Sequence, residues 1–220
     1  MSAAPSQIST PEAFQAEFSV SRETLDRLET YARVLRHWQK TINLVAPSTL
    51  DHLWHRHFAD SAQLLRHAPA DAKTWVDVGS GAGFPGLVLA ILLAEKGKYR
   101  VILVESDSRK AAFLGEVARQ TGVPVEIAPA RIEKTTTQAK VGSVDVVTAR
   151  ALAPLPRLFG LIAPLFSPET TALLLKGREV EGEIQAARQD WGFDASLAPS
   201  ITDAEGRIAV IRNLHGLSEG

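Results

Sequence analysis

The stretch that decides the fold is residues 75–86, which read WVDVGSGAGFPG. Its first four residues are mostly apolar and predict a buried strand, and the next five alternate glycine with a small residue. Glycine lets the chain turn sharply and lets a ligand approach bare backbone. We therefore expect a strand that ends in a ligand-binding loop, followed by a helix that begins near Gly86.

Strands and helices are expected to alternate on the carboxyl side of this loop. The expected strands are 101–104, 125–128, 144–147 and 172–175, and the expected helices are 86–94, 109–120, 155–165 and 178–191. Such alternation predicts a mostly parallel sheet with helices on both faces, a Rossmann-like α/β fold. The last strand, 207–213, is expected to pair with 192–197 in an antiparallel excursion.

Helices are expected on the amino side of the loop. Thr10 and Pro11 are typical of a helix start, and residues 21–39 carry apolar residues at spacings of three and four, which predicts one apolar face. A third helix is expected over residues 50–67. These elements divide the chain into a disordered tail (1–9), an N-terminal helical cap (10–70) and an α/β domain (71–220).

The spacing of the glycines selects among nucleotide ligands. A dinucleotide-binding loop, G-x-G-x-x-G, needs glycine where this chain has Phe84 followed by Pro85. Phe84 and Pro85 would crowd a pyrophosphate at the start of the helix. A nucleoside ligand without phosphates does not need that space. Gly79 and Gly81 are the candidate backbone contacts. Glu105 ends the next strand, where a carboxylate can accept hydrogen bonds from both ribose hydroxyls; a solvated glutamate is the plain alternative.

Three further residues are candidates for contact with such a ligand. The backbone of Ile132 and the carboxylate of Glu133 follow the third expected strand and could read the edge of an adenine; a glutamate that only stabilises a helix N-terminus fits this position as well. Asp77 could hold the ammonium group of a methionine moiety, directly or through water, or only brace the glycine turn. Together these residues suit S-adenosylmethionine.

Residue types and motifs that the chain lacks exclude some acceptors for a methyl group from this ligand. The chain has no cysteine, which excludes disulfides, cysteine-ligated zinc and the cysteine adduct used to methylate pyrimidine C5. Residues 145–154 lack the Asn- or Asp-Pro-Pro-aromatic motif common in enzymes that methylate exocyclic amines. The acceptors that stay open are a ring nitrogen, a hydroxyl or carboxyl group, a small molecule and a protein.

Arg150 is the candidate catalytic residue, because it lies where the fourth strand opens toward the methyl donor. A guanidinium there could hydrogen-bond the edge of a guanine or a phosphate, while a surface salt bridge is equally compatible. Guanine N7 carries a lone pair and no proton, so it could attack a sulfonium methyl without a general base. Proximity and orientation would then supply most of the catalysis.

Composition gives no sign of a chain tuned as a whole for polyanions. Its 45% hydrophobic and 22% charged residues are ordinary for a globular protein, and its net charge is −1. A nucleic-acid surface must therefore be a local patch. Between residues 31 and 67 such a local excess is formed by Arg33, Arg36, Lys40, Arg56 and Arg66, which could contact phosphate, although a solvated helix face explains it equally well.

Other features favour a cytoplasmic protein without a metal site. His52, His55 and His57 have poor spacing for a shared metal, because on a regular helix the last points about 140° from the first. No apolar run approaches the roughly 20 residues that span a bilayer. The absence of cysteine suits a reducing cytoplasm. We expect a monomer.

Several segments together resemble the bacterial small-subunit ribosomal RNA 7-methylguanosine methyltransferase G family, also called glucose-inhibited division protein B. Residues 77–86 resemble the family's Asp-x-Gly-x-Gly-x-Gly-x-Pro-Gly, and residues 56–61 resemble its Arg-His-x-x-Asp-Ser. Segments 38–44, 150–151 and 175–177 also fit. Glu105 replaces a common aspartate and Phe84 a frequent leucine, and both changes keep the chemical character.

The resemblance implies a class I S-adenosylmethionine-dependent methyltransferase that modifies N7 of a guanine in 16S ribosomal RNA of the small ribosomal subunit. By position, the cofactor contacts would be Gly79, Phe84, Ile132, Glu133 and Arg150. RNA contacts are expected at Arg33, Arg36, Lys40, Arg56, His57 and Lys176. Two other interpretations stay open: a small-molecule O-methyltransferase of the same fold, and a nucleoside-binding module without catalysis.

Overall fold

The computed structural model describes residues 7–134 and 141–217. Its strands form one seven-stranded sheet in the order β3-β2-β1-β4-β5-β7-β6. Their bounds are β1 Thr74–Val78, β2 Arg100–Val104, β3 Glu126–Ala128, β4 Val146–Arg150, β5 Thr171–Lys176, β6 Trp191–Pro199 and β7 Arg207–Gly216. Strands β1 to β5 are parallel, and β7 pairs antiparallel with both β5 and β6. The mostly parallel sheet and the antiparallel excursion are both confirmed.

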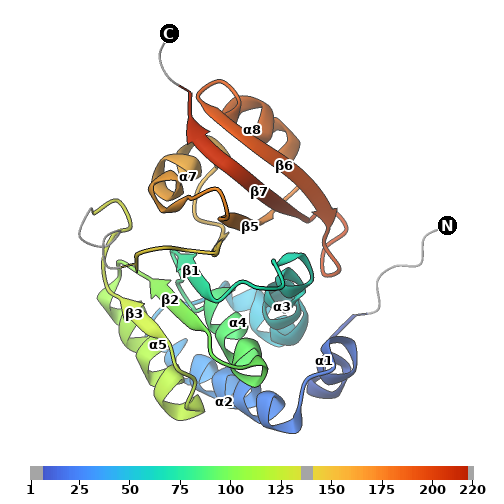
Figure 1. Cartoon of the computed structure of the whole chain (residues 1–220). Helices are drawn as coiled ribbons and strands as arrows, with labels where there is room; N and C mark the ends of the chain where they lie inside the picture. The colour runs from blue at the N-terminus through green and yellow to red at the C-terminus, as the bar shows by residue number, and fades with distance from the viewer. Residues whose placement is uncertain (1–6, 135–140, 218–220) are drawn as a thin grey trace, which may run out of the picture.

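Helices cover both faces of the sheet (Figure 1). Their bounds are α1 Pro11–Phe18, α2 Arg22–Trp38, α3 Asp60–Ala62, α4 Gly86–Leu93, α5 Ser108–Thr121, α7 Leu155–Ile162 and α8 Val180–Ala187. Side-chain caps fix where the first two begin, because Thr10 accepts a hydrogen bond from the Ala13 N–H and Ser21 accepts one from the Thr24 N–H. The predicted starts of these two helices are confirmed.

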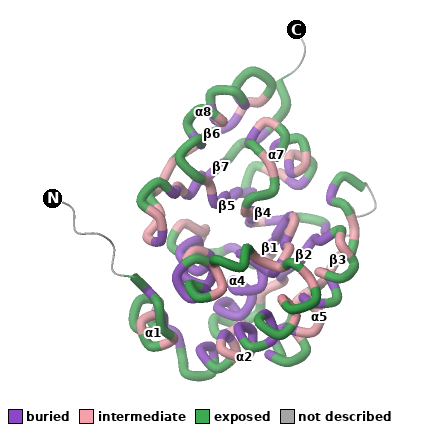
Figure 2. The backbone as a smooth tube through the Cα atoms, turned by 180° about the vertical axis from the view of Figure 1, so that it is seen from behind, coloured by how far each residue is buried: buried purple, intermediate pink, exposed green. Residues whose placement is uncertain are grey.

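Two hydrophobic clusters lie on the two sides of the sheet. One joins the inward faces of α2, α4 and α5 to β1 and β2, and it includes residues of the N-terminal helices such as Phe14 and Tyr31. The other joins α7 and α8 to alternate residues of the same strands. Every residue of α4 is buried, as expected for a helix under a sheet (Figure 2). The sheet is therefore the central layer of the molecule, with one hydrophobic cluster on each face.

Several element boundaries differ from the sequence-based expectation. Strand β4 starts at Val146 rather than 144, and just before it the Asp145 carboxylate accepts the backbone N–H groups of Lys73 and Thr74. The expected helix 50–67 is a chain of short irregular turns, 3-10 over Pro47–His52, π-type over Trp54–Ala59, then α3, then 3-10 over Gln63–His67. Helix α8 ends at Ala187, so that Trp191 can begin β6.

The strand order places a ligand site at one edge of the sheet. Strand β1 lies between β2 and β4, so the sequence order reverses beside β1, and ligands of such sheets bind at the carboxyl ends of the strands there. Residues 1–6 of the expected disordered tail lie outside the described residues. Within the described ranges, none of the helices has the length and apolar character needed to cross a bilayer.

Candidate cofactor and acceptor sites

The glycine loop presents one open side and one packed side. Gly81 has a φ of +56°, and a Cβ added to it would meet only the carbonyl oxygen of Gly79, at 3.8 Å. Gly83 has a φ of +87°, but a Cβ there would lie 2.8 Å from the Cβ of Leu87. Gly83 is therefore required by packing against α4, whereas Gly81 borders space that a ligand can fill.

Glu105 joins the end of β2 to this open side. Its Oε2 accepts the backbone N–H of Gly81 at 2.7 Å, and its Oε1 accepts the N–H of Asp107 at 2.7 Å. A carboxylate has about four acceptor positions, so each oxygen can still accept one hydroxyl hydrogen. This is the donor–acceptor pattern that two ribose hydroxyls need.

Asp77 lies beneath the loop rather than on its open side. The residue is 1% exposed, and its Oδ1 accepts the hydroxyl hydrogen of Thr148 at 2.7 Å. Burial raises the pKa of the Asp77 carboxyl above its ordinary value, while the hydrogen bond from Thr148 lowers it. The position suits the bracing role, since contact with an ammonium group would require an opening in the loop.

Phe84 is packed inside the protein. Its ring is stacked with the rings of Tyr31 and His57, with centroid distances of 5.4 Å and 4.7 Å, and the residue is 3% exposed. Its side chain therefore has little surface to offer a cofactor. The sequence predicted that Phe84 contacts the cofactor. The burial of its ring leaves only the Phe84 backbone for such a contact.

Two cavities adjoin at the end of β4. The smaller, about 240 Å³, is lined by Gly79, Ile132 and Glu133 together with neighbouring residues. The larger, about 610 Å³, is lined by Arg150 and by residues of the N-terminal turns and of the β6–β7 loop. Leu152 and Ala153 line both. These two apolar residues thus lie between the cofactor candidates of the smaller cavity and Arg150.

Arg150 is held by the turn that precedes α3. One guanidinium nitrogen, Nη1, donates to the backbone oxygen of Arg56 at 3.2 Å and lies 3.5 Å from Oδ2 of Asp60. The other, Nη2, lies 2.9 Å from Nδ1 of His57. The guanidinium carbon also lies 4.9 Å from the centroid of the Phe84 ring. The Arg150 side chain is 20% exposed, so it reaches the cavity from a fixed position.

Two residues expected to contact RNA are engaged inside the protein. His57 is 7% exposed, and burial together with the charges of Arg150 and Arg56 lowers its pKa to about 3, so its ring is neutral near pH 7. The Lys176 ammonium donates to Glu183 at 2.7 Å and to the Ala153 carbonyl at 2.8 Å. Neither offers a free cation to a phosphate, because one is neutral and the other is paired.

The other basic candidates are more accessible. Arg33, Arg36 and Lys40 are exposed, and within the described ranges none of the three forms an ion pair. Arg56 is half exposed and lies 3.4 Å from Asp203. Arg33 and Arg36 lie on α2 and Lys40 lies two residues beyond its end, a grouping that suits contact with phosphates.

Sequence reasoning missed the residues that position these groups. Thr49 contacts His57, Tyr31 stacks with Phe84 and Thr148 donates to Asp77, and no sequence motif reports these contacts. Asp60 was present in the Arg-His-x-x-Asp-Ser segment, yet nothing in its spacing pointed to Arg150, ninety residues away.

The fold and the glycine-loop site together define a class I S-adenosylmethionine-dependent methyltransferase. Solved structures of this class are similar in fold. The O-methyltransferase TomG from Streptomyces achromogenes, in complex with its cofactor, gives a TM-score of 0.58 at 16% identity, covering 96% of this chain and 99% of that chain. A methyltransferase from Aquifex aeolicus gives 0.53 at 16% identity, covering 83% and 97%.

Sequence comparison resolves the family. The family model described as GidB, rRNA small subunit methyltransferase G, matches residues 24–211. Relatives named ribosomal RNA small subunit methyltransferase G include one from Parvibaculum lavamentivorans, 53% identical over 210 residues (96% of this chain, 92% of the relative). Another, from Rhodospirillum centenum, is 52% identical over 195 residues (89% and 87%). The chain belongs to the rRNA small subunit methyltransferase G family.

Proposed function

We propose that this protein transfers the methyl group of S-adenosylmethionine to N7 of a guanine in 16S ribosomal RNA of the small ribosomal subunit. The observation that supports N7 as the acceptor atom is how the possible general bases of the larger cavity are hydrogen-bonded. Its carboxylates Asp60, Glu183 and Asp203 and its histidine His57 all accept hydrogen bonds from protein donors. None of these four groups is held without a protein donor, and attack by N7 needs no general base.

The reaction balances without a protein base. The lone pair of N7 forms a bond to the methyl carbon while the carbon–sulfur bond breaks, and its electron pair stays on sulfur to give S-adenosylhomocysteine. The guanine becomes a cationic 7-methylguanine, and no proton leaves. The cofactor supplies an electrophilic methyl group; the protein supplies proximity and in-line orientation.

Arg150 is the residue we assign to the acceptor. Its guanidinium can donate to guanine O6 or to a phosphate from the wall of the larger cavity. A hydrogen bond to N7 itself would occupy the lone pair that must attack, so we place the contact away from N7. An O-methyltransferase acting on a small molecule, the competing function, would need a base to remove the hydroxyl proton.

Cofactor and RNA contacts complete the proposal. We assign the backbone of Gly79, Gly81, Phe84 and Ile132 and the carboxylates of Glu105 and Glu133 to S-adenosylmethionine, with Asp77 as the brace of the loop. Arg33, Arg36, Lys40 and Arg56 are assigned to RNA phosphates. We further propose that the enzyme acts as a monomer in the cytoplasm, where its ribosomal substrate lies.

The experiment supplies three acceptor pools with a labelled methyl donor: naked 16S rRNA, assembled small subunits and a metabolite extract. The wild-type enzyme should label an RNA pool. Arg150→Ala should lower the rate at least about tenfold, and Arg150→Lys should recover little, because a point charge does not reproduce a planar fork. Label that appears only in the metabolite pool, or full activity of Arg150→Ala, would overturn the proposal.

A further inference from the structure

The turn formed by Arg56, His57 and Asp60 surrounds the guanidinium of Arg150 with three acceptors. These are the Arg56 carbonyl oxygen at 3.2 Å, His57 Nδ1 at 2.9 Å and Asp60 Oδ2 at 3.5 Å. Residues 54–59 adopt a π-type turn, and such turns are frequent at functional sites. The segment therefore holds the side chain of the last residue of β4.

These contacts leave part of the guanidinium free. An arginine has five N–H donors, and the three acceptors engage both hydrogens of Nη1 and one of Nη2. The Nε–H and the second Nη2 hydrogen have no acceptor within the described ranges. Two neighbouring donors of a planar fork are what bidentate recognition of an oxygen pair requires.

The hydrogen-bond donors around His57 settle its tautomer. The Thr49 hydroxyl gives its single hydrogen to the Ala46 carbonyl, 2.7 Å away, so the same oxygen must accept from His57 Nε2, at 2.8 Å. The ring proton is therefore on Nε2, and Nδ1 carries a bare lone pair. Because arginine can only donate, that lone pair is the acceptor for Nη2 of Arg150.

Packing holds the His57 ring in one orientation. The ring is stacked with Phe84, with an interplanar angle of 25°, and the residue is 7% exposed. Burial and the adjacent positive charges keep its pKa at about 3, so protonation does not compete with the contact to Arg150 near pH 7.

We propose that His57 is a positioning residue, which holds the Arg150 guanidinium by a bare Nδ1 so that two of its donors face the acceptor. The Thr49 hydroxyl fixes the tautomer that makes this possible. The inference rests on the proposed role of Arg150 and adds a residue that touches neither cofactor nor RNA. It also explains the Arg-His-x-x-Asp segment as an arginine-holding turn.

The test compares His57→Leu, which removes the acceptor, with His57→Asn, whose side-chain oxygen can take the place of Nδ1. His55→Leu is the matched control, since His55 lies on the same turn, is equally buried and accepts instead from the Ile8 N–H. Methylation of the wild-type RNA substrate, binding of S-adenosylhomocysteine by calorimetry and the melting temperature are measured for each variant.

We expect kcat of His57→Leu to fall about tenfold or more, with cofactor affinity within about twofold of wild type. His57→Asn should recover to within about threefold, and Thr49→Val, at a half-buried position, should lose about threefold. His55→Leu should lower the melting temperature as much as His57→Leu and leave kcat of the folded protein unchanged.

Two results would overturn the inference. The first is a wild-type kcat in His57→Leu while Arg150→Ala is inactive. That result would remove the positioning role of His57 and keep the role of Arg150. The second is equal loss in His57→Leu and His55→Leu without rescue by asparagine, which makes His57 a residue of stability alone. Full activity of Arg150→Ala would instead remove the proposed role of Arg150 itself.

Discussion

Oε2 of Glu105 accepts a hydrogen bond from the backbone N–H of Gly81 at 2.7 Å, which ties the end of β2 to the middle of the glycine loop. The same carboxylate accepts the Asp107 N–H with its other oxygen. The residue that we assign to the ribose hydroxyls is thus also the residue that shapes the loop around them. Its removal should affect the cofactor through both routes.

Glu105→Ala should weaken binding of S-adenosylhomocysteine by roughly 1–3 kcal/mol, the scale of hydrogen bonds to a charged group. Glu105→Gln keeps one acceptor oxygen and should lose less. Calorimetry gives the affinity, and the melting temperature shows how much of the loss is loop stability. An alanine variant that binds like wild type would make Glu105 an ordinary strand-end residue.

Gly81→Ala should abolish cofactor binding, because its Cβ would enter the space that the ligand needs. Gly122→Ala is the matched control: both positions have a left-handed φ, +56° and +67°, and Gly122 borders open space at the end of α5. Each should cost about 1 kcal/mol of unfolding free energy. Cofactor titration should separate them, and equal binding by both variants would contradict the assignment of the open side.

His57 should make the free energy of unfolding decrease as the pH falls. Its folded pKa of about 3 lies below the unfolded value near 6.5, so between these values only the unfolded chain binds this proton. The contribution of neutral His57 to the free energy of unfolding is therefore fully present above pH 6.5. It is lost as the pH falls, by at most about 1.4 kcal/mol per pH unit.

Chemical denaturation at several pH values between 7 and 4 measures this slope. His57→Asn should flatten it, and His37→Asn, at an exposed position on α2, should not. If both variants keep the wild-type slope, His57 is not buried in the neutral form.

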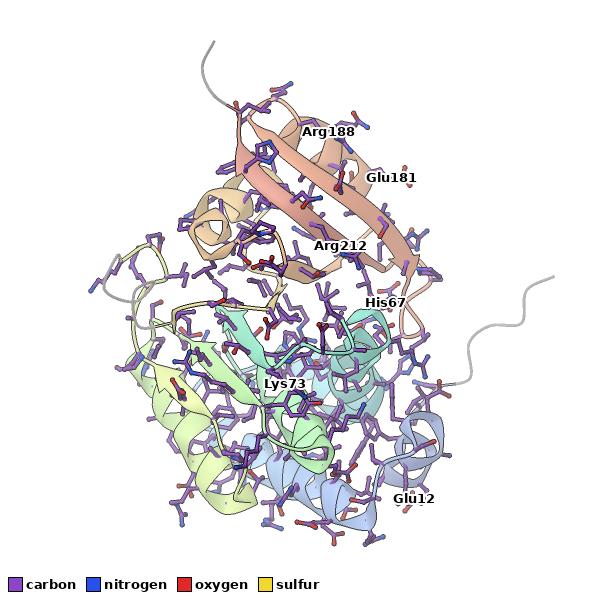
Figure 3. All side chains as sticks on the ribbon, viewed as in Figure 1. Glu12, His67, Lys73, Glu181, Arg188 and Arg212 are labelled. Carbon is purple, nitrogen blue, oxygen red and sulfur yellow. The ribbon has the colours of Figure 1, made fainter. Side chains whose placement is uncertain are left out.

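Replacing Arg33, Arg36 and Lys40 together by alanine should weaken RNA binding and reduce its dependence on salt. Each lost phosphate contact lowers the slope of log K against log salt by roughly 0.7–0.9. Arg212→Ala is the control, an exposed arginine on β7 away from α2 (Figure 3). Filter binding over a range of salt concentrations measures both, and equal slopes for the triple variant and wild type would remove this face from the RNA surface.

The sheet and the glycine loop could be predicted because their signals are local. The run 75–86 combines an apolar strand with alternating glycines, and the alternation of strands and helices that follows fixes a parallel sheet. Glu105 was predictable as well, since the end of the second strand lies beside the loop in any such sheet.

The support of the site could not be predicted, because it depends on contacts between distant segments. A pattern of apolar residues does not report that Thr148 and Arg150 belong to β4, where polar side chains continue the strand. Regular helix geometry placed His55 and His57 on different faces without partners. Only the fold shows that His57 meets Arg150 and Phe84, whereas His55 caps the backbone at Ile8.

The most direct test of the central claim is the position of the methyl group on the RNA. Small-subunit rRNA treated with the enzyme and S-adenosylmethionine is digested to nucleosides for mass spectrometry, and alkaline cleavage maps any 7-methylguanosine. We predict 7-methylguanosine at a guanine of 16S rRNA, formed at a rate that shows no titrating base between about pH 6.5 and 8.5. Methyl label on an exocyclic amine or a ribose, with none at N7, would contradict it.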